Sequence, residues 1–119
     1  MTQHQADNFA MRWLSAWNAH DLSRILEHYA PDIEFSSPFA ARLMGNSTVR
    51  GHAALRHYFA LALGRFPDLH FRDVHAFPGA NSVALVYRSV SDLEAAETMV
   101  FDGDGLICRV WAHYRAAIG

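Results

Sequence analysis

Glu97 is the residue whose type and setting point most clearly to acid–base chemistry. It interrupts the apolar run 95–101, and strand alternation places its side chain on the same inward face as Met99. Burial of a carboxyl group there raises its pKa, which suits it to act as a hydrogen-bond donor or general acid. The alternative is a structural role, in which Glu97 forms an ion pair with Arg88 or Arg109 or lies at a frayed sheet edge.

Aromatic side chains supply further candidates for a pocket around Glu97. Tyr114 and Trp13 carry O–H and N–H donors that can reach a ligand, and Tyr114 joins Glu97 as a catalytic candidate. Aromatic residues at such spacing also serve simply as core. The remaining wall of the pocket is expected to consist of large apolar side chains, namely Trp17, Phe35, Tyr58, Phe59 and Met99.

The eight histidines form no metal-binding pattern. His52 and His57 are five residues apart, and His70 and His75 differ in strand parity, so neither pair presents both rings to one ion. His57 is the second candidate, after Glu97, for an acid–base group in the pocket. Because no Gly-rich phosphate loop is present either, the sequence predicts neither a metal nor an organic cofactor.

Hydrophobic spacing in the first half of the chain predicts three helices. The first begins near Phe9 and ends at 18–20, the second follows the N-cap Asp21 and ends at 30–31, and the third opens near Gly51 and ends at 66–67. Between the second and third helices, residues 32–37 alternate as a strand closed by a proline, and a loop follows through 44–47.

The second half of the chain predicts strands and turns. The expected strands cover 69–77, 82–90, 94–101 and 106–115, and the Asp-Gly-Asp-Gly sequence at 102–105 is the strongest hairpin signal. Four consecutive strands joined by short turns form an antiparallel meander, on which the preceding helices bury their apolar faces. The pattern therefore predicts one α+β domain over residues 1–119.

This order of elements, with four local strings, resembles the nuclear transport factor two-like superfamily, in its SnoaL-like and ketosteroid-isomerase-like branch. The strings are Trp17 to Asp21, Tyr29 to Phe35, Val49 to Gly51, and Phe101 to Ile107. The resemblance implies a cone-shaped α+β barrel, with three N-terminal helices packed on a curved antiparallel sheet around a pocket. It also implies a homodimer paired through the outer face of the sheet. Members include isomerases, dehydratases, cyclases, hydrolases and binding modules, so the resemblance alone does not give the function.

The resemblance also implies roles for individual positions. It places Ser37 where the isomerases have their catalytic base, Trp13 and Glu97 at the two donor positions, and Tyr114 near a pocket aromatic residue. A serine hydroxyl with an ordinary pKa does not replace a carboxylate base, so ketosteroid-type isomerisation by the usual residues is not expected. Ser37 is retained as a ligand-binding residue. The sequence thus favours a small-molecule-binding domain with cofactor-independent acid–base chemistry; the alternative is a non-catalytic ligand-binding or dimerisation module.

The amino-acid composition limits which classes of binding partner and which cellular compartment we expect. The chain carries 10 basic and 12 acidic residues, a net charge of -2, with no run of like charges, which argues against nucleic acid or a membrane surface as partner. The expected partner is a small apolar or amphipathic molecule. The single cysteine, Cys108, favours a reducing, cytoplasmic setting, and the polar N-terminus lacks the pattern of a signal peptide.

Overall fold

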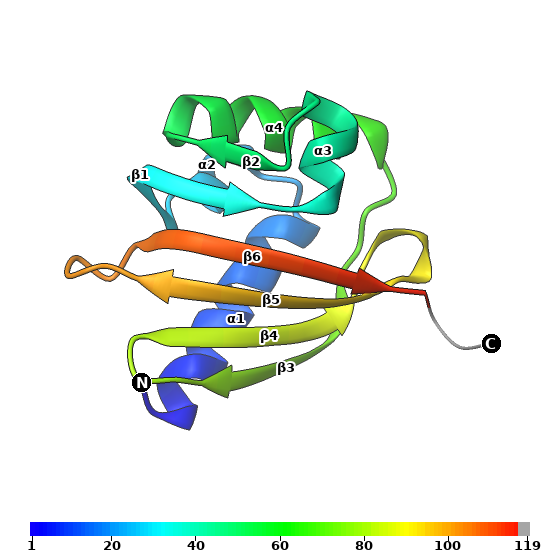
Figure 1. Cartoon of the computed structure of the whole chain (residues 1–119). Helices are drawn as coiled ribbons and strands as arrows, with labels where there is room; N and C mark the ends of the chain where they lie inside the picture. The colour runs from blue at the N-terminus through cyan, green and yellow to red at the C-terminus, as the bar shows by residue number, and fades with distance from the viewer. Residues whose placement is uncertain (117–119) are drawn as a thin grey trace.

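A six-stranded sheet with the order β2-β1-β6-β5-β4-β3 organises the computed structural model, which describes residues 1–116 (Figure 1). The helix α1 crosses one face of the sheet behind β3 to β6, while the other helices gather beside β1 and β2. The strands are β1 (Tyr29–Ser36), β2 (Thr48–Arg50), β3 (Arg72–Pro78), β4 (Ser82–Arg88), β5 (Glu94–Phe101) and β6 (Ile107–Arg115).

Three of the helices correspond to those predicted. They are α1 (Gln3–Asn18), α2 (Leu22–Leu26) and α4 (His52–Arg65). A capping box between Thr2 and Gln5 starts α1 six residues before the predicted start, because the polar first turn is stabilised by its cap rather than by apolar spacing. Asp21 caps α2 as predicted, its side chain accepting a hydrogen bond from the Arg24 N–H.

A fourth helix, α3 (Pro38–Met44), occupies a segment that the sequence was expected to leave as a loop. Ser37 is its N-cap, Pro38 stands in its first turn, and Gly45 ends it with a φ of +75°. A proline at the start and a left-handed glycine at the end are typical helix signals, so Pro38 opens a helix as well as following a strand. The turn predicted near 91–92 is present as a short 3-10 helix, η1 (Val90–Asp92).

The boundary between α2 and β1 also differs from the prediction. The helix ends at Leu26, and Tyr29 and Pro31 belong to β1, whose start was expected at residue 32. Pro31 is tolerated because the pairing of β1 with β6 is irregular between Tyr29 and Glu34, where no ladder hydrogen bond is required from it. The short strand β2, which pairs with the end of β1, was not predicted.

The predicted meander is present, with β3 to β6 paired antiparallel in chain order. The β1–β6 pair is parallel, and the long connection that such a pair requires is the chain from α3 through β5. The sheet is open, with β2 and β3 as its edges, and matches the cone of the predicted α+β fold class. Among the described residues, no helix combines the length and apolar character needed to cross a membrane.

Candidate functional site

The site is built around Glu97 in β5, which lies between β4 and β6. On β4 the residue opposite Glu97 is Leu85, and on β6 it is Ala112. Tyr87 and Tyr114 both lie opposite the neighbouring Ala95, which makes them diagonal neighbours of Glu97 on the same face of the sheet. The small side chain of Ala95 leaves room for both phenol rings to converge on the carboxyl group.

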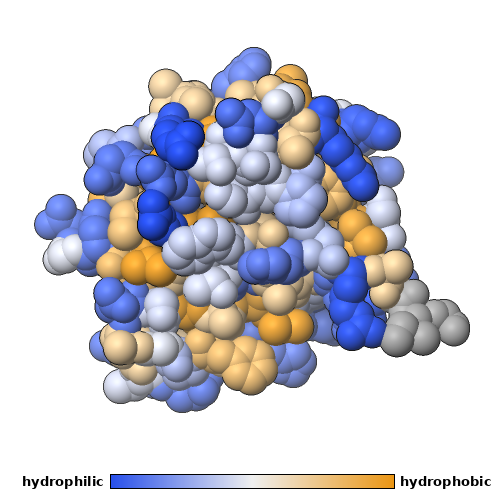
Figure 2. Space-filling model, in the orientation of Figure 1, coloured by the Kyte–Doolittle hydropathy of each residue, from blue (hydrophilic) through white to orange (hydrophobic). Residues whose placement is uncertain are grey.

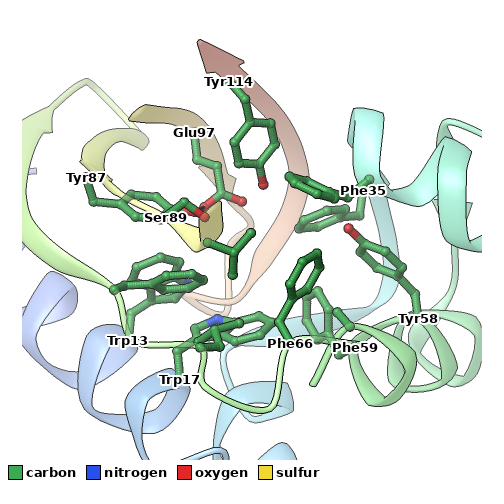
Figure 3. Close-up of a pocket in the computed structure, with 15 residues that line it drawn as sticks. Trp13, Trp17, Phe35, Tyr58, Phe59, Phe66, Tyr87, Ser89, Glu97 and Tyr114 are labelled. Atoms are coloured by element: carbon green, nitrogen blue, oxygen red, sulfur yellow. Dashed lines mark hydrogen bonds between the residues drawn. The ribbon is translucent and has the colours of Figure 1, made fainter. Parts of the chain in front are cut away.

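The carboxyl group of Glu97 is held by one hydrogen bond. The Tyr87 hydroxyl donates to Oε2 at 2.7 Å, and Glu97 is only 4% exposed. Figure 3 shows its second oxygen turned into the pocket toward Tyr114; this Oε1 accepts no hydrogen bond from residues 1–116. The proposed arginine partners are engaged elsewhere, Arg88 with Asp92 and Arg109 with Glu34, so the structural alternative of an ion pair is not realised.

Burial determines the protonation states of Glu97, Tyr87 and Tyr114. Desolvation raises the pKa of Glu97 to about 7, and the hydrogen bond from Tyr87 offsets part of that rise. Burial and the nearby carboxyl group likewise raise the pKa of Tyr87 and Tyr114 well above the usual value for tyrosine. At neutral pH both phenols are therefore hydrogen-bond donors, whereas Glu97 is present in both its charged and its neutral form.

Aromatic rings enclose the space next to Glu97. The lining residues come from α1, β1, α3, α4, the 66–71 segment, β4 to β6, and η1 with its N-cap: Trp13, Trp17, Phe35, Phe39, Tyr58, Phe59, Ala62, Phe66, Leu69, Phe71, Tyr87, Ser89, Val90, Glu97 and Tyr114. They leave about 40 Å³ of free space. A cavity of about 150 Å³ is needed to hold benzene, so a ring-sized ligand fits only if a wall moves or if part of it extends through the mouth.

The chamber adjoins a second depression at Phe66, Leu69, Ser89 and Val90, which line both, and this side of the chamber is called its mouth. The Phe39 ring meets Tyr114 edge-on at 4.8 Å between centroids and Phe66 at 5.6 Å. Outside the mouth, Phe66, Leu69, Ser89 and Val90 also line a second depression of about 400 Å³, whose other residues are largely charged or polar. The site therefore combines a tight aromatic chamber with a wider polar vestibule.

Two indole groups on α1 differ in how their N–H groups are satisfied. Trp13 Nε1 donates to the Tyr29 hydroxyl at 3.3 Å. Trp17 Nε1, one helical turn later, is buried without an acceptor within hydrogen-bonding geometry among the described residues. An orphaned buried donor typically destabilises a fold by about 1–3 kcal/mol.

Comparison with known proteins identifies the family. The family model for the SnoaL-like domain matches residues 10–118. The chain belongs to the SnoaL-like family. A crystal structure of a SnoaL-like protein of unknown function from Burkholderia thailandensis is 38% identical, with a TM-score of 0.92 over 97% of this chain and 98% of that one.

More distant structures share the fold of this SnoaL-like domain. A proposed isomerase of the SnoaL-like family from Agrobacterium tumefaciens has a TM-score of 0.75 at 17% identity, over 95% of this chain and 99% of that one. A proposed polyketide cyclase from Sinorhizobium meliloti has a TM-score of 0.76 at 12% identity, over 95% of this chain and 100% of that one. No protein with a curated description matches this chain.

Most of the predicted site residues line the pocket of this SnoaL-like domain. The structure brings together Glu97, Tyr114, Trp13, Trp17, Phe35, Tyr58 and Phe59. Three predicted residues lie outside the pocket. Ser37 is buried just after β1, where its hydroxyl accepts a hydrogen bond from the Phe39 N–H at 3.1 Å; hydrogen bonding to the same side chain offsets part of the rise that burial causes in the pKa of Tyr58 and Tyr114, which do line the pocket.

Met99 and His57 lie outside the chamber for two different reasons. Met99 shares the inward face of Glu97, but it is fully buried between Val83 and Val110, two residues further from the pocket along β5. His57 lies on the exposed side of α4 and does not reach the pocket, whereas the adjacent Tyr58 does. Strand parity and helical spacing indicate which way a side chain points, but not how far the cavity extends.

Sequence reasoning missed about half of the lining. The missed residues are Phe39, Ala62, Phe66, Leu69, Phe71, Tyr87, Ser89 and Val90. The inward alternation of β4 at 83, 85 and 87 contains a signal for Tyr87, since its register against β5 puts it diagonal to Glu97. Phe39 was missed together with its helix. Within residues 1–116, no three His, Cys, Asp or Glu side chains converge as metal ligands.

Proposed function

We propose that this SnoaL-like domain binds a small apolar or amphipathic metabolite and acts on it by acid–base catalysis through Glu97, with neither metal nor organic cofactor. The observation that supports this most strongly is a buried carboxyl group with a pKa of about 7 and one oxygen turned into an aromatic pocket. A group whose pKa lies near the working pH can both donate and accept a proton in one catalytic cycle. Isomerisation, dehydration, cyclisation and hydrolysis all use such a step.

Tyr114 complements Glu97 in this scheme. Its hydroxyl faces the same space in Figure 3 and stays protonated because burial raises its pKa. It therefore donates a hydrogen bond to an oxygen on which negative charge develops while Glu97 moves the proton. Aromatic walls exclude water, which strengthens both interactions.

The size of the chamber limits what can react there. About 40 Å³ of free space accommodates a small reacting group beside Glu97, while the rest of the molecule extends through the mouth into the vestibule of about 400 Å³. A substrate with an apolar reacting end and a polar remainder suits this arrangement. A rigid polycyclic steroid does not, which agrees with the absence of a carboxylate at Ser37.

The experiment is a proton-exchange assay in heavy water. Small unsaturated ketones, lactones and epoxides are incubated with the protein, and deuterium incorporation, isomerisation and hydrolysis are followed by proton NMR. We expect turnover that follows the ionisation of Glu97 near pH 7, and a loss of about 100-fold or more in Glu97→Gln, the usual size of a general acid–base contribution. His57→Ala is the matched control and should retain full activity.

A non-catalytic binding or dimerisation module is the second candidate. The near-filled chamber favours it, and so does Ser37, which stands where the resemblance to ketosteroid isomerases implies a carboxylate base. Ligands that bind to the pocket without any turnover sensitive to Glu97→Gln would establish this second function and reject the enzymatic one.

We also propose a homodimer formed through the outer face of the sheet. Trp111 and Phe77 are 39% and 58% exposed there, and Val86 and His113 lie on the same face. Figure 2 looks onto this face and shows hydrophobic residues gathered over its lower half, where β3 and β4 lie. An exposed apolar patch of this kind often marks an association site. Light scattering should give twice 13.4 kDa, and a mass of 13.4 kDa at micromolar concentration would reject the dimer.

A cytoplasmic location is part of the same proposal. Cys108 is the single cysteine of the chain and is free, as expected for a protein kept in a reducing compartment. Fractionation of the native host with detection by antibody tests the location, and recovery in an extracytoplasmic fraction would overturn it.

A further inference from the structure

Ser89 is a buried serine whose hydroxyl the fold does not use. It follows β4 as the N-cap of η1, but its side chain forms no capping hydrogen bond, and Glu97 takes its hydrogen bond from Tyr87 instead. By contrast, Ser37 caps α3 and its hydroxyl accepts a hydrogen bond at 3.1 Å. Ser89 is 7% exposed. A hydroxyl buried to this extent usually has a hydrogen-bond partner, so its absence calls for an explanation.

The hydroxyl of Ser89 borders free space and is not sealed in the core. Among residues 1–116, Trp17 Nε1 is the only side-chain polar atom that is both fully covered and unpartnered. Ser89 Oγ has no partner there and is not in that class, so part of its surface is accessible. Four residues line both the chamber and the vestibule: Phe66, Leu69, Ser89 and Val90. Ser89 therefore supplies the polar side chain at the junction of the two spaces.

The strand register places Ser89 nearer the mouth than Glu97. On β4 the residue opposite Glu97 is Leu85, and Ser89 lies four residues further toward the mouth. The buried positions alternate at 83, 85, 87 and 89, so Ser89 shares the inner face of the sheet with Tyr87. Figure 3 shows Ser89 on the side of the pocket that carries Tyr87 and Glu97. A ligand that contacts Glu97 and extends into the vestibule therefore passes Ser89.

The turn that carries Ser89 is held in place by its own contacts. Ser91 and Asp92 have left-handed backbone, with φ of +54° and +58°, a conformation that residues other than glycine rarely adopt. Asp92 is bound by Arg72 at 2.8 Å and by Arg88 at 3.7 Å. The Ser89 N–H also donates to the carbonyl at the far end of the turn at 2.7 Å. Since these contacts fix the turn, little ordering is required when a ligand binds to Ser89.

We propose that Ser89 determines the substrate class of the pocket by binding a neutral oxygen group of the ligand at the junction of chamber and vestibule. A serine hydroxyl is both donor and acceptor, so a hydroxyl or carbonyl group satisfies it. None of the 15 residues that line the chamber is Lys, Arg or His, so an ionised group would lose its hydration without gaining a counter-charge. The preferred ligand carries one oxygen group beside Glu97 and a second one at Ser89.

This inference rests on the proposed function of the pocket, because it requires that a ligand enters the chamber. It adds a contact that acts in binding and takes no part in proton transfer. Glu97 and Tyr114 act on the reacting end of the molecule, whereas Ser89 selects the part that follows. A ligand with a methyl group in place of the second oxygen would leave the Ser89 hydroxyl unpaired.

The first test asks whether the fold needs the hydroxyl, and it requires no ligand. Ser89→Ala should keep its melting temperature within about 1 °C of the unchanged protein, since no hydrogen bond within the fold is lost. Ser37→Ala should lower the melting temperature by about 4 °C, because it removes a helix cap. An equal fall in Ser89→Ala, or its failure to fold, would mean that the hydroxyl serves the fold and would overturn the inference.

The second test compares ketones that differ only in a hydroxyl group. Methyl ketones with a terminal hydroxyl are each paired with the ketone that has a methyl group in its place. The series begins with hydroxyacetone and butanone and lengthens by one carbon at a time to hydroxyhexanone and heptanone. Dissociation constants come from NMR titration of nitrogen-15-labelled protein. In at least one pair, Ser89→Ala should weaken binding of the hydroxyketone about fivefold, the effect of one neutral hydrogen bond, and leave its methyl counterpart unchanged.

Ser91→Ala is the matched control for this titration. Ser91 belongs to the same turn and is exposed, and it lines the vestibule but not the chamber. Its removal should not change the ratio of hydroxyketone to methyl-ketone affinity. A ratio that is unchanged in Ser89→Ala for every pair, or that falls equally in Ser91→Ala, would overturn the inference.

These tests separate the inference from the proposed function. A ratio that depends on Ser89, in a protein without turnover dependent on Glu97, would reject catalysis and keep the recognition role. Turnover dependent on Glu97 with a ratio that is insensitive to Ser89→Ala would keep the enzyme and reject the recognition role. Binding of none of the ketones would reject the inference together with the binding pocket on which it rests.

Discussion

The two ends of the inner sheet face differ more in chemistry than in burial. At the pocket end, Tyr87 and Tyr114 lie diagonal to Glu97 on the same face of the sheet, while two residues further along β5 Met99 lies directly between Val83 and Val110. Glu97 is 4% exposed and Met99 is 0% exposed. The same strands, at nearly the same depth, therefore carry ionisable and hydroxyl groups at one end and only apolar groups at the other.

This difference indicates that the Met99 end of the inner sheet face stabilises the fold, whereas the Glu97 end contains groups that lower its stability. Buried carboxyl groups and unpartnered N–H groups destabilise a fold, and the described part of this chain places both around one chamber. Sites where a sequence departs from good packing are commonly functional. The predictions below test this division between a closed end and a pocket end.

The largest effect is expected at the closed end, from Met99→Ala. Removing a fully buried side chain between Val83 and Val110 leaves a cavity and should lower the free energy of unfolding by about 2–5 kcal/mol. Binding of ketone probes to the folded protein should be unchanged, because Met99 does not line the chamber. Urea denaturation and the probe titration measure the two quantities. A loss of less than 1 kcal/mol, or a change in probe affinity, would show that the two ends are not separate.

The next largest effect is expected in the free energy of unfolding, which Glu97 should make dependent on pH. Its folded pKa of about 7 exceeds the ordinary value of 4.5, so the folded state holds the proton more strongly than the unfolded state. The stability contributed is complete below about pH 4.5 and is lost as the pH rises to about 7, a loss of about 3 kcal/mol. Glu97→Gln keeps the shape and should remove this fall.

The measurement is the difference in unfolding free energy between the unchanged protein and Glu97→Gln across pH 4 to 8. Taking the difference cancels the titration of the histidines, which both proteins share. Curves that stay parallel over the whole range would mean that Glu97 is charged and satisfied in the fold, and would remove the acid–base role proposed for it.

The sequence predicted the meander better than it predicted the region around the mouth. Strands β4 to β6 alternate over most of their length and have strong turn signals, so their limits fall within two residues of the prediction. The segment 29–50 has mixed signals, since Tyr29 fits a helical stripe and Pro38 fits both a strand end and a helix start. Local patterns there cannot show that β1 pairs with β6 on the far side of the meander.

The sequence predicted those site residues whose direction follows from strand alternation. It did not predict those whose position depends on how strands and helices pack together. The inward direction of Glu97 and Tyr114 follows from strand alternation alone. The partnership with Tyr87 requires the β4–β5 register, and the placement of Phe39 requires a helix that the sequence did not reveal. No sequence pattern distinguishes Trp13 from Trp17, because the acceptor that satisfies one of them comes from the approach of Tyr29 on β1.

A smaller effect is expected from Tyr87→Phe, which removes the single hydrogen bond to Glu97. That bond lowers the pKa of Glu97, so the pKa should rise further in the variant. Stability should fall by about 1 kcal/mol, and more at pH 8 than at pH 5, since the bond is stronger to the charged carboxylate. Carbon-13 NMR of the Glu97 carboxyl group measures the pKa directly. Tyr58→Phe is the control, because Tyr58 lines the chamber without a hydrogen bond to Glu97, and a pKa that moves equally in both variants would contradict the assignment.

The smallest effect is expected from His57→Ala. This variant tests whether a residue of α4 that does not line the chamber affects ligand binding. His57 lies on the exposed side of α4, one residue before Tyr58, which lines the chamber. Replacing an exposed side chain on a helix away from caps and ion pairs usually changes stability by no more than about 0.5 kcal/mol. Probe affinity and any turnover dependent on Glu97 should also be unaffected. A tenfold fall in probe affinity or in turnover would mean that α4 rotates when a ligand binds and brings His57 into the chamber. The residues that line the pocket would then differ between the free and the bound protein.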